Sequence, residues 1–210
     1  MTRVTSHISI SLDGFVAGPE QRPDNPLGIG GERLHEWAFA THEWQRRHGS
    51  GTGAASADSD VVAASVRNVG AYVMGRNMFG GGPGPWDQSW HGWWGEEPPF
   101  HLPVFVLTHH ERAPLQMQGD TTFHFVTGGV AEAERRAREA AGDRDVSVIG
   151  GATAIQQFLA AGLLDELQLH VVPVLLGAGE RLLVNCGEPT LEPTEVVASP
   201  QVTHITYRVR

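Results

Sequence analysis

The sequence predicts an α/β protein with a largely parallel central sheet. Along its 210 residues, strand and helix patterns follow the order strand, helix, strand, long loop, two strands, helix, strand, helix, strand. Strands that alternate with helices are typical of parallel sheets. Two last strand patterns, at residues 194–198 and 202–209, flank Ser199-Pro200 and predict an antiparallel hairpin. With 40% hydrophobic and 19% charged residues, a single domain over residues 1–210 is expected.

The first strand is predicted at residues 4–12, where apolar and polar side chains alternate before Asp13-Gly14 turns the chain. Residues 18–32 are rich in glycine and proline and predict a loop. Residues 49–59 are small and predict a flexible connection. Together these segments delimit a loop-rich insertion at about residues 18–58.

A helix is predicted inside this insertion, over residues 32–48. The triplet His-Glu-Trp recurs after seven residues, and such a step returns to nearly the same helix face. His35 and His42 begin the two triplets. Two histidines are too few for a firm metal site, so a solvated helix face is the favoured interpretation and no metal is expected.

A second helix is predicted over residues 60–69, where valines recur on one stripe and Asp58, Ser59 or Asp60 can serve as the N-cap. The strand that follows, at residues 71–74, ends at Gly75-Arg76. Residues 80–102 carry Gly-Pro sequences and four of the six tryptophans, and they predict a second loop-rich insertion.

The remaining elements alternate regularly. The expected strands are 103–107, 122–126, 146–149 and 167–172, and the expected helices are 131–141 and 153–161. Two glycines, Gly150 and Gly151, separate a buried strand from the second of these helices. Such a junction directs backbone N–H groups and the positive end of a helix dipole at one point, which suits a phosphate.

The composition excludes several classes of function. The net charge of −9 leaves no basic surface for a nucleic acid. The single cysteine, Cys186, excludes an internal disulfide and Cys-x-x-Cys metal sites. No lysine is present, which excludes a P-loop lysine and a Schiff base. No segment has the length or apolar character of a signal or membrane span, so a cytoplasmic protein with no membrane partner is expected.

Four motifs together resemble the dihydrofolate reductase-like superfamily, and specifically the reductase domain at the carboxyl end of the bifunctional riboflavin-biosynthesis deaminase-reductase. They are Ser11-Leu12-Asp13-Gly14-Phe15-Val16-Ala17, Val73-Met74-Gly75-Arg76, Val104-Phe105-Val106-Leu107-Thr108, and the segment from Ile149-Gly150-Gly151 through Gly162-Leu163-Leu164-Asp165-Glu166-Leu167 to Pro173-Val174-Leu175-Leu176-Gly177. The resemblance covers most of the chain outside the two insertions. It implies a three-layer αβα sandwich that binds NADPH across the carboxyl ends of the strands, commonly as a homodimer.

The resemblance also implies cofactor contacts. The adenosine phosphates would be met by Gly75, Arg76 and Asn77, and the 2′-phosphate by Thr108 and His109. The pyrophosphate and the nicotinamide side would be held by Gly150, Gly151, Ala152, Thr153 and Ala154. The nicotinamide ring would be bordered by Ser9 and Val16. The chain departs from the family where Gly-Arg-x-Thr is Gly75-Arg76-Asn77-Met78, which lacks the phosphate-binding hydroxyl. The preference for NADPH over NADH would then depend on Arg76 and Arg112.

Three carboxylates are candidates for the chemistry. In folate reductases an acidic residue near the start of the corresponding helix binds the pterin ring, and Asp58 and Asp60 occupy about that position. We therefore expect Asp58 to bind substrate and Asp60 to be catalytic, although an aspartate at a helix start is more often an N-cap. Asp13 lies near the expected nicotinamide and is the other catalytic candidate, or else a turn residue before Gly14.

The tryptophan-rich loop is the second candidate for substrate contacts. Trp86, Trp90 and Trp93 could stack on a flat heterocycle, with Trp86 the preferred residue. The alternative is that they fill a hydrophobic subcore or a dimer interface.

The sequence thus predicts an NADPH-dependent oxidoreductase that transfers a hydride to a small heterocyclic or carbonyl substrate, such as a pterin or a pyrimidine ribose derivative. The alternative is a nucleotide-binding module or sensor with the same fold and no turnover. The zinc-binding His-x-Glu and Pro-Cys-x-x-Cys motifs of the deaminase half are absent from this sequence.

Overall fold

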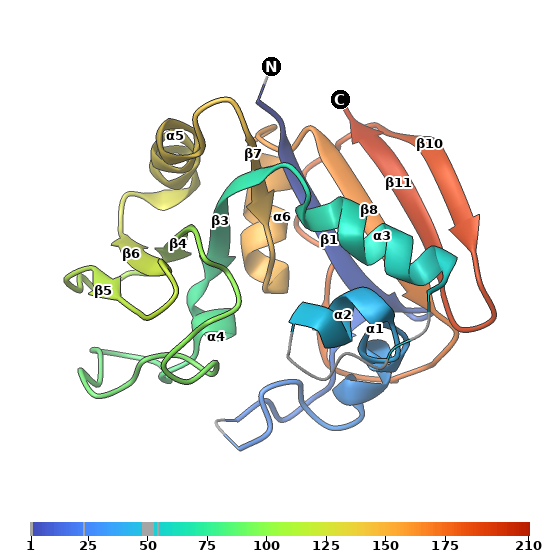
Figure 1. The fold of residues 1–210 in the computed structure, drawn as a ribbon, viewed down its shortest axis with the longest axis horizontal. Helices are drawn as coiled ribbons and strands as arrows, with labels where there is room; N and C mark the ends of the chain where they lie inside the picture. Colours follow the sequence, from blue (N-terminus) through green and yellow to red (C-terminus); the bar gives the residue numbers. More distant parts are fainter. Residues whose placement is uncertain (1, 23, 48–52, 54) are drawn as a thin grey trace.

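The computed structural model describes residues 2–22, 24–47, 53 and 55–210, and its elements carry the labels of Figure 1. The strands are β1 (Val4–Ser11), β2 (Phe15–Ala17), β3 (Val69–Gly75), β4 (Pro103–Leu107), β5 (Leu115–Gln116), β6 (Thr122–Val126), β7 (Asp145–Val148), β8 (Glu166–Val172), β9 (Glu180–Arg181), β10 (Leu191–Ala198) and β11 (Thr203–Val209). The helices are η1 (Gly31–Leu34), α1 (Glu36–Phe39), α2 (His42–Arg47), α3 (Ala57–Val66), α4 (Arg76–Phe79), α5 (Gly129–Ala141) and α6 (Ala152–Ala160).

Nine strands form the central sheet, in the order β10-β11-β8-β1-β7-β3-β4-β6-β5. The run from β8 to β6 is parallel throughout. β11 pairs antiparallel with both β8 and β10, so the carboxyl-terminal hairpin is present as predicted. A small second sheet joins β2 to β9.

Helices and loops cover both faces of the sheet, which gives the three-layer sandwich (Figure 1). On one face, α5 and α6 pack with the strands around a core that includes Ile155 and Phe158. Alanines at positions 133, 137 and 141 are all buried, and their four-residue spacing lets α5 approach the sheet closely. The opposite face is covered by two separate units. They are α1–α3 over the β1, β8 and β11 half, and the 80–102 loop over the β3, β4 and β6 half.

The predicted single helix over residues 32–48 is wrong. The segment consists instead of η1, α1 and α2. Thr41 divides the last two, because its hydroxyl donates to the carbonyl of Ala38 and accepts from the N–H of Trp44. A side chain that bonds its own backbone in this way competes with the helix ladder. His35 and His42 consequently belong to different elements, and only His42 is exposed.

The predicted helix over residues 60–69 begins and ends too late. α3 starts at Ala57 and its N-cap is Ser56, whose hydroxyl accepts from the N–H of Ser59. The expectation that Asp58, Ser59 or Asp60 would be the N-cap is therefore wrong. β3 already begins at Val69, so the valine stripe ran from the helix into the strand. Of the stretch predicted to be flexible, residues 49–52 and 54 lie outside the described residues.

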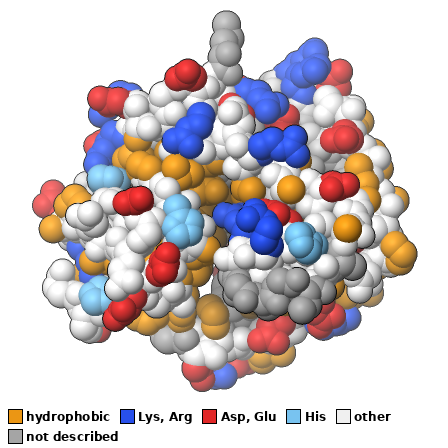
Figure 2. Space-filling view, viewed as in Figure 1, with side chains coloured by type: hydrophobic (Ala, Val, Ile, Leu, Met, Phe, Trp, Pro, Cys, Tyr) orange, Lys and Arg blue, Asp and Glu red, His pale blue; other side chains and the backbone are white. Residues whose placement is uncertain are grey.

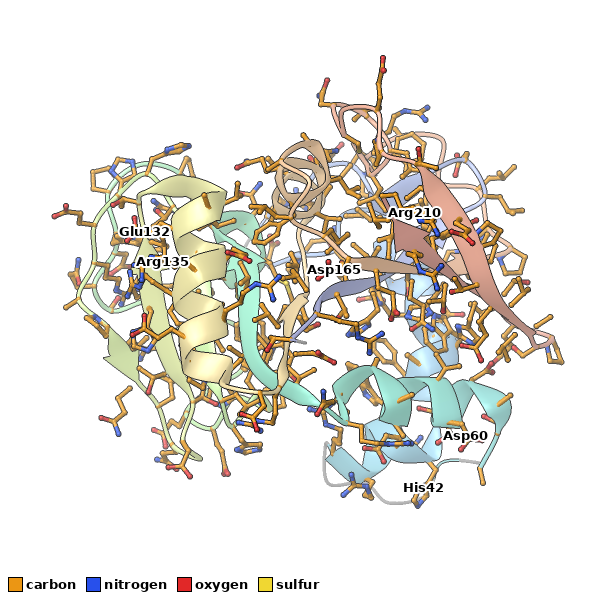
Figure 3. The ribbon with its side chains drawn as sticks, turned by 90° about the horizontal axis from the view of Figure 1, so that it is seen from above. His42, Asp60, Glu132, Arg135, Asp165 and Arg210 are labelled. Atoms are coloured by element: carbon orange, nitrogen blue, oxygen red, sulfur yellow. The ribbon has the colours of Figure 1, made fainter. Side chains whose placement is uncertain are left out.

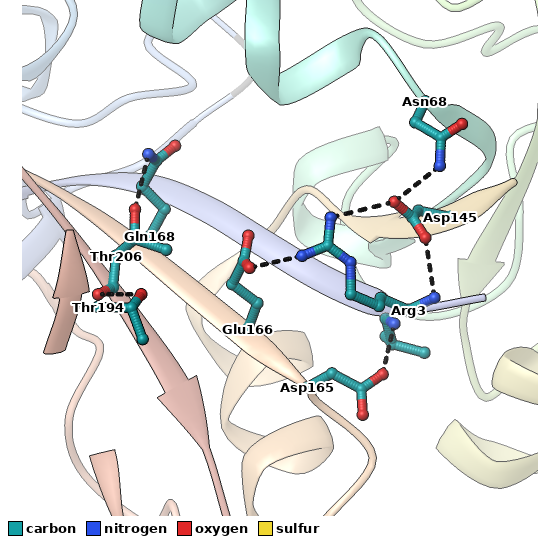
Figure 4. A network of polar contacts seen from close by, with 9 residues as sticks. Arg3, Asn68, Asp145, Asp165, Glu166, Gln168, Thr194 and Thr206 are labelled. Carbon is teal, nitrogen blue, oxygen red and sulfur yellow. Dashed lines mark hydrogen bonds and ion pairs between the residues drawn. The ribbon is translucent and has the colours of Figure 1, made fainter. Parts of the chain in front are cut away.

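The amino-terminal edge of the sheet is held by polar contacts around Arg3 (Figure 4). The Asp145 carboxylate accepts from the backbone N–H of Arg3 at 2.8 Å and from the Asn68 amide at 3.0 Å. The Arg3 guanidinium pairs with Glu166 on β8 at 2.8 Å. These contacts tie β1, β7 and β8 together at the edge opposite to the carboxyl ends of the parallel strands. None of the described helices is long and apolar enough to cross a membrane.

Candidate cofactor and substrate site

The carboxyl ends of the parallel strands meet along one edge of the sheet, and there β3 and β7 are joined directly. The N–H of Gly75 donates to the carbonyl of Gly150 over 2.6 Å. A Cβ atom built on Gly75 would lie 3.5 Å from the Cβ of Ala154, so the end of β3 packs against the first turn of α6. The predicted segments around Gly75 and Gly150 are therefore neighbours. In open α/β sheets, ligands bind outside the strand ends where the connections diverge.

The start of α6 forms an open cradle. Gly151 is its N-cap, with extended backbone and no side chain to cap the helix. A Cβ atom on Gly151 would meet nothing within 4 Å. The first bond of the helix ladder runs from the N–H of Ala154 to the carbonyl of Gly151, at 3.1 Å, so the N–H groups before it lie outside the ladder. The peptide between Gly150 and Gly151 is cis, and Thr153 is exposed beside it.

Two arginines flank the Gly75 side of this edge. The Arg76 guanidinium lies over the Trp86 ring, 3.7 Å from its centroid. Its Nε and Nη2 atoms, and Nη1 of Arg112, are buried without a hydrogen-bond partner among the described residues. Burial lowers the pKa of both guanidinium groups, and the charge of Asp87 offsets only part of this effect at Arg112. Unpaired buried guanidinium N–H groups are costly and favour an anion.

The other residues expected at the adenosine end line its border. Asn77 and His109 are exposed, and the Thr108 hydroxyl accepts from the N–H of His110 at 3.1 Å. An open pocket of about 530 Å³ lies beside Arg112. It is lined by Gln88, Glu111, Arg112, Ala113, Phe125 and Thr127.

Ser9 and Val16, expected near the nicotinamide, lie on opposite faces of the sheet. Val16 is buried in the core under α6. Ser9 is buried on the other face, where its hydroxyl accepts from the indole N–H of Trp37 at 3.1 Å.

Asp13 is held as an ionised anchor. Its carboxylate accepts from the Ser11 hydroxyl at 2.6 Å and from the N–H groups of Leu176 and Gly177. The hydrogen bond from Ser11 and those from Gly177 and Leu176 lower the pKa of Asp13 to about 2. A carboxylate with this pKa carries no proton to donate at neutral pH. The geometry favours the turn role and gives the expected catalytic role no support.

Asp58 and Asp60 point in different directions from the first turn of α3. Asp60 is exposed, and Figure 3 labels it on α3 in a view from above Figure 1. Asp58 is buried, and its Oδ1 atom lies 3.0 Å from Nε2 of His204 on β11. The side chain expected to bind substrate is thus directed at the sheet, toward a second buried polar group.

The tryptophan loop forms a subcore, the alternative expected for it. Trp86 is 8% exposed, with Arg76 over its face and Phe79 and Phe125 in edge contact. Its indole N–H donates to the carbonyl of His110 at 2.8 Å. Little of the Trp86 ring is free to stack on a heterocycle.

Between this loop and α1–α3, the surface is hollowed, with apolar side chains in the hollow and arginine and histidine side chains beside it (Figure 2). The strand positions on this face of β1 are polar and include His7 and Ser9. Arg47 of α2 spans the two units, since it donates to the carbonyl of Pro99 at 3.2 Å. We call this region the central groove.

Comparison with protein families identifies the chain. The model of the RibD C-terminal domain matches residues 2–205. The chain belongs to this family. The resemblance drawn from the four sequence motifs is therefore confirmed, and so is the α/β sandwich fold.

Solved structures place the RibD C-terminal domain fold over the whole chain. A Shewanella sp. PV-4 protein whose name refers to riboflavin biosynthesis has 23% identity and a TM-score of 0.65, with 100% of this chain and 99% of that chain covered. The riboflavin biosynthesis reductase Rib7 of Saccharomyces cerevisiae has 12% identity and a TM-score of 0.56, with 100% and 89% covered. At such identities the likeness establishes the fold alone.

One curated relative matches in sequence. The uncharacterized protein YyaP of Bacillus subtilis is 28% identical over 94 residues, which cover 43% of this chain and 50% of that protein. The match thus spans half the length of this relative.

Two polar residues of the site were not found by sequence reasoning. His170 and His204 are 4% and 1% exposed, and they face each other on β8 and β11. Each is the one histidine of its strand, so no local motif marks either one. Their pairing depends on the antiparallel register, which the sequence pattern does not define. Among the described residues, no group of three His, Cys, Asp or Glu side chains is arranged to hold a metal ion.

Proposed function

We propose that this RibD C-terminal domain protein is an NADPH-dependent reductase acting on a small heterocyclic or carbonyl compound held in the central groove. The observation that carries the proposal is the open cradle at Gly151, on the edge where Arg76 and Arg112 each hold buried guanidinium nitrogens with no hydrogen-bond partner among the described residues. A phosphate at this edge could accept from both the helix start and the arginines. Membership of a reductase-type family supports the same conclusion.

Backbone N–H groups at a helix start and guanidinium groups are the kinds of group that hold the phosphates of NADPH. The N–H groups around Gly151 and Ala152 would hold the pyrophosphate, and Arg76 and Arg112 would provide positive charge for the remaining phosphate. When bound, the cofactor supplies a hydride. The protein has to orient the two reactants, exclude water and supply a proton.

The central groove suits a flat polar substrate. Its two walls are the tryptophan loop and α1–α3, and Arg47 closes it at the Pro99 end. His7 and Tyr72 lie close to Arg47. Burial, followed by the charge of Arg47, lowers the pKa of His7. A pterin or a pyrimidine ribose derivative could place its ring here, with its reacting carbon toward Ser9.

The proposal is tested by NADPH oxidation in the presence of dihydrofolate, a pyrimidine ribose derivative or a quinone. Oxidation that depends on one of these acceptors supports a reductase. Methotrexate competition then distinguishes a specific folate reductase from the other acceptors.

One observation favours a second candidate, a nucleotide-binding module without turnover. The hydrogen bonds of Asp13 hold it in its ionised form, so this expected catalytic carboxylate is not available as a proton donor. NADPH binding with no oxidation against any acceptor would favour the module.

Two further properties belong to the proposal. We propose a homodimer that uses the apolar segment around Leu175, which is 66% exposed, whereas Leu167 and Leu169 are buried in the monomer core. A cytoplasmic location stays a prediction.

A further inference from the structure

We propose that Asp58, His204 and His170 form a buried proton relay that opens toward the central groove, and that it supplies the proton accompanying hydride transfer. Only the second half of this proposal rests on the proposed reductase function. The arrangement of the protons can be measured without any substrate.

The relay joins three separate elements across one face of the sheet. Oδ1 of Asp58 on α3 lies 3.0 Å from Nε2 of His204, and Nδ1 of His204 lies 2.8 Å from Nδ1 of His170. His204 and His170 are opposite each other in the register of β11 and β8. All three side chains are buried. Trp37 covers the pair, with ring centroids 4.8 Å from His170 and 4.9 Å from His204.

These contacts allow only two arrangements of protons while Asp58 is ionised. When His204 is neutral, its one proton lies on Nε2 and is donated to the carboxylate. Its Nδ1 atom must then accept, so the proton of His170 lies on Nδ1 and Nε2 of His170 is bare. When His204 is cationic, both its nitrogens donate. His170 must then accept at Nδ1, and its own proton moves to Nε2.

The exchange between these arrangements is a relay. If Nε2 of His170 gives up its proton, the proton between the two Nδ1 atoms passes to His170, and His204 becomes neutral. One proton therefore leaves at Nε2 of His170, although the positive charge was held on His204. Oδ1 of Asp58 lies 3.0 Å from Nε2 of His204 and accepts its proton in both arrangements.

The surroundings direct the outer end of the relay toward the groove. His170 is next to Ser9 in the register of β8 and β1, and its ring centroid lies 5.8 Å from that of His7. The titratable groups around the pair are Asp58 from α3, His7 from β1 and His35 from the turn before α1, with Arg47 acting on His7. Burial, followed by the charges of His7 and His204, holds the pKa of His170 well below its ordinary value. His170 therefore transmits the proton and does not store it.

The chemical step balances with one proton from the relay. The substrate carbon gains a hydride, with its two electrons, from the reduced cofactor. The π electrons of the substrate C=N or C=O bond move to its nitrogen or oxygen, which gains one proton. That proton leaves Nε2 of His170 in the neighbourhood of His7, whose ring centroid lies 5.8 Å from that of His170. The relay then regains a proton from solvent after product release.

The first test is nitrogen NMR of the histidine imidazoles, with the pH varied and no ligand added. We expect the proton of His170 to move from Nδ1 at high pH to Nε2 at low pH, with a coupling between the two Nδ1 atoms. The transition should shift down by about 1 pH unit or more in Asp58→Asn, because the neutral amide no longer stabilises cationic His204.

Thr206→Val is the matched control. Thr206 accepts a hydrogen bond from Gln168 at 3.0 Å, two residues along the same two strands, and Figure 4 shows this pair. This variant should leave the transition of His170 unchanged. A proton that stays on Nε2 of His170 at every pH in the wild type, or a transition that ignores Asp58→Asn, would overturn the relay. The wild-type measurement tests the relay even if Asp58→Asn does not fold.

The second test is the pH profile of single-turnover NADPH oxidation with dihydrofolate or whichever acceptor reacts. The rate should fall with rising pH as His170 loses its Nε2 proton. In Asp58→Asn, the pH at which the rate falls should move in the same direction as the NMR transition. An equal loss of rate at all pH values would show a structural role and contradict proton delivery. If the wild type oxidises no NADPH with any acceptor, the proposed function fails, while the NMR result still decides the relay.

Discussion

The N–H of Gly75 donates to the carbonyl of Gly150 at 2.6 Å, which fixes the end of β3 against the junction between β7 and α6. This contact brings together two motifs that lie far apart in the sequence. The proposed cofactor site depends on it, because the arginine that follows Gly75 and the helix that follows Gly151 must face the same ligand.

Replacement of Gly151 should separate binding from stability. A Cβ atom at Gly151 meets open space in the protein, and the backbone there is extended, so Gly151→Ala should leave the Tm nearly unchanged. It would occupy the space that we assign to the pyrophosphate. We expect the Kd for NADPH, measured by calorimetry, to rise about 10-fold or more, a loss of about 1.4 kcal/mol. Ala161→Ser, at the other end of α6, is the control and should leave the Kd unchanged.

Arg112 should set the preference between the two nicotinamide cofactors. Its Nη1 atom is buried without a partner among the described residues, and charged hydrogen bonds to phosphate are strong. Arg112→Gln should weaken NADPH binding about 10-fold and leave NADH binding nearly unchanged. NADH is the internal control. The carbonyl of Trp90 accepts a hydrogen bond from Arg112, so damage to the tryptophan loop would weaken the binding of both cofactors. Equal losses of affinity for NADPH and NADH would show that Arg112 does not bind the 2′-phosphate.

Asp145 should make the stability depend on acid pH. Burial by itself would raise the pKa of Asp145, but the hydrogen bonds from Arg3 and Asn68 and the charge of Arg3 lower it below the ordinary value of 3.8. Its contribution is therefore complete above pH 3.8 and is lost as the pH falls through the lower pKa of the folded protein. Asp145→Asn should cost about 1–3 kcal/mol at pH 7 in urea unfolding.

Glu166→Gln is the matched control for Asp145→Asn. Glu166 pairs with the same Arg3 side chain, but the pair is partly exposed and should contribute below about 1 kcal/mol. If the two variants lost similar free energies of unfolding at pH 7, the buried hydrogen bonds of Asp145 would contribute no more than the exposed ion pair of Glu166.

The dimer is tested by light scattering at micromolar concentration. We expect twice the chain mass of 22.7 kDa, and Leu175→Asp should produce the monomer because Leu175 is 66% exposed. Val196→Asp, which alters a 61% exposed residue on strand β10, should leave the mass unchanged. A monomer mass for the wild type would contradict the dimer.

Sequence reasoning predicted the fold where the pattern was local and strong. The alternation in β1, the strand runs of β4 and β7 and the spacing of α5 all placed elements within a few residues of their observed bounds. The 32–48 segment was misread because Thr41 uses its side chain to end one short helix and begin another. A repeat of seven residues does not reveal such a competing hydrogen bond.

The candidate site was predicted less completely. The neighbouring positions of Gly75 and Gly150 follow from parallel strands, whose carboxyl ends share one edge. The pairing of Asp58 with His204 depends on how α3 is turned over the sheet and on the register of β11. No local sequence pattern defines the orientation of α3 or this register, and so the two buried histidines on β8 and β11 were not predicted.

The most direct test of the account is a calorimetric titration of the wild-type protein with NADPH. The proposed cradle predicts saturable binding of one NADPH per chain, with a Kd of about 100 μM or below. No binding at about 1 mM NADPH would contradict the assignment of the Gly150 and Gly151 edge as a cofactor site, and with it the proposed reductase.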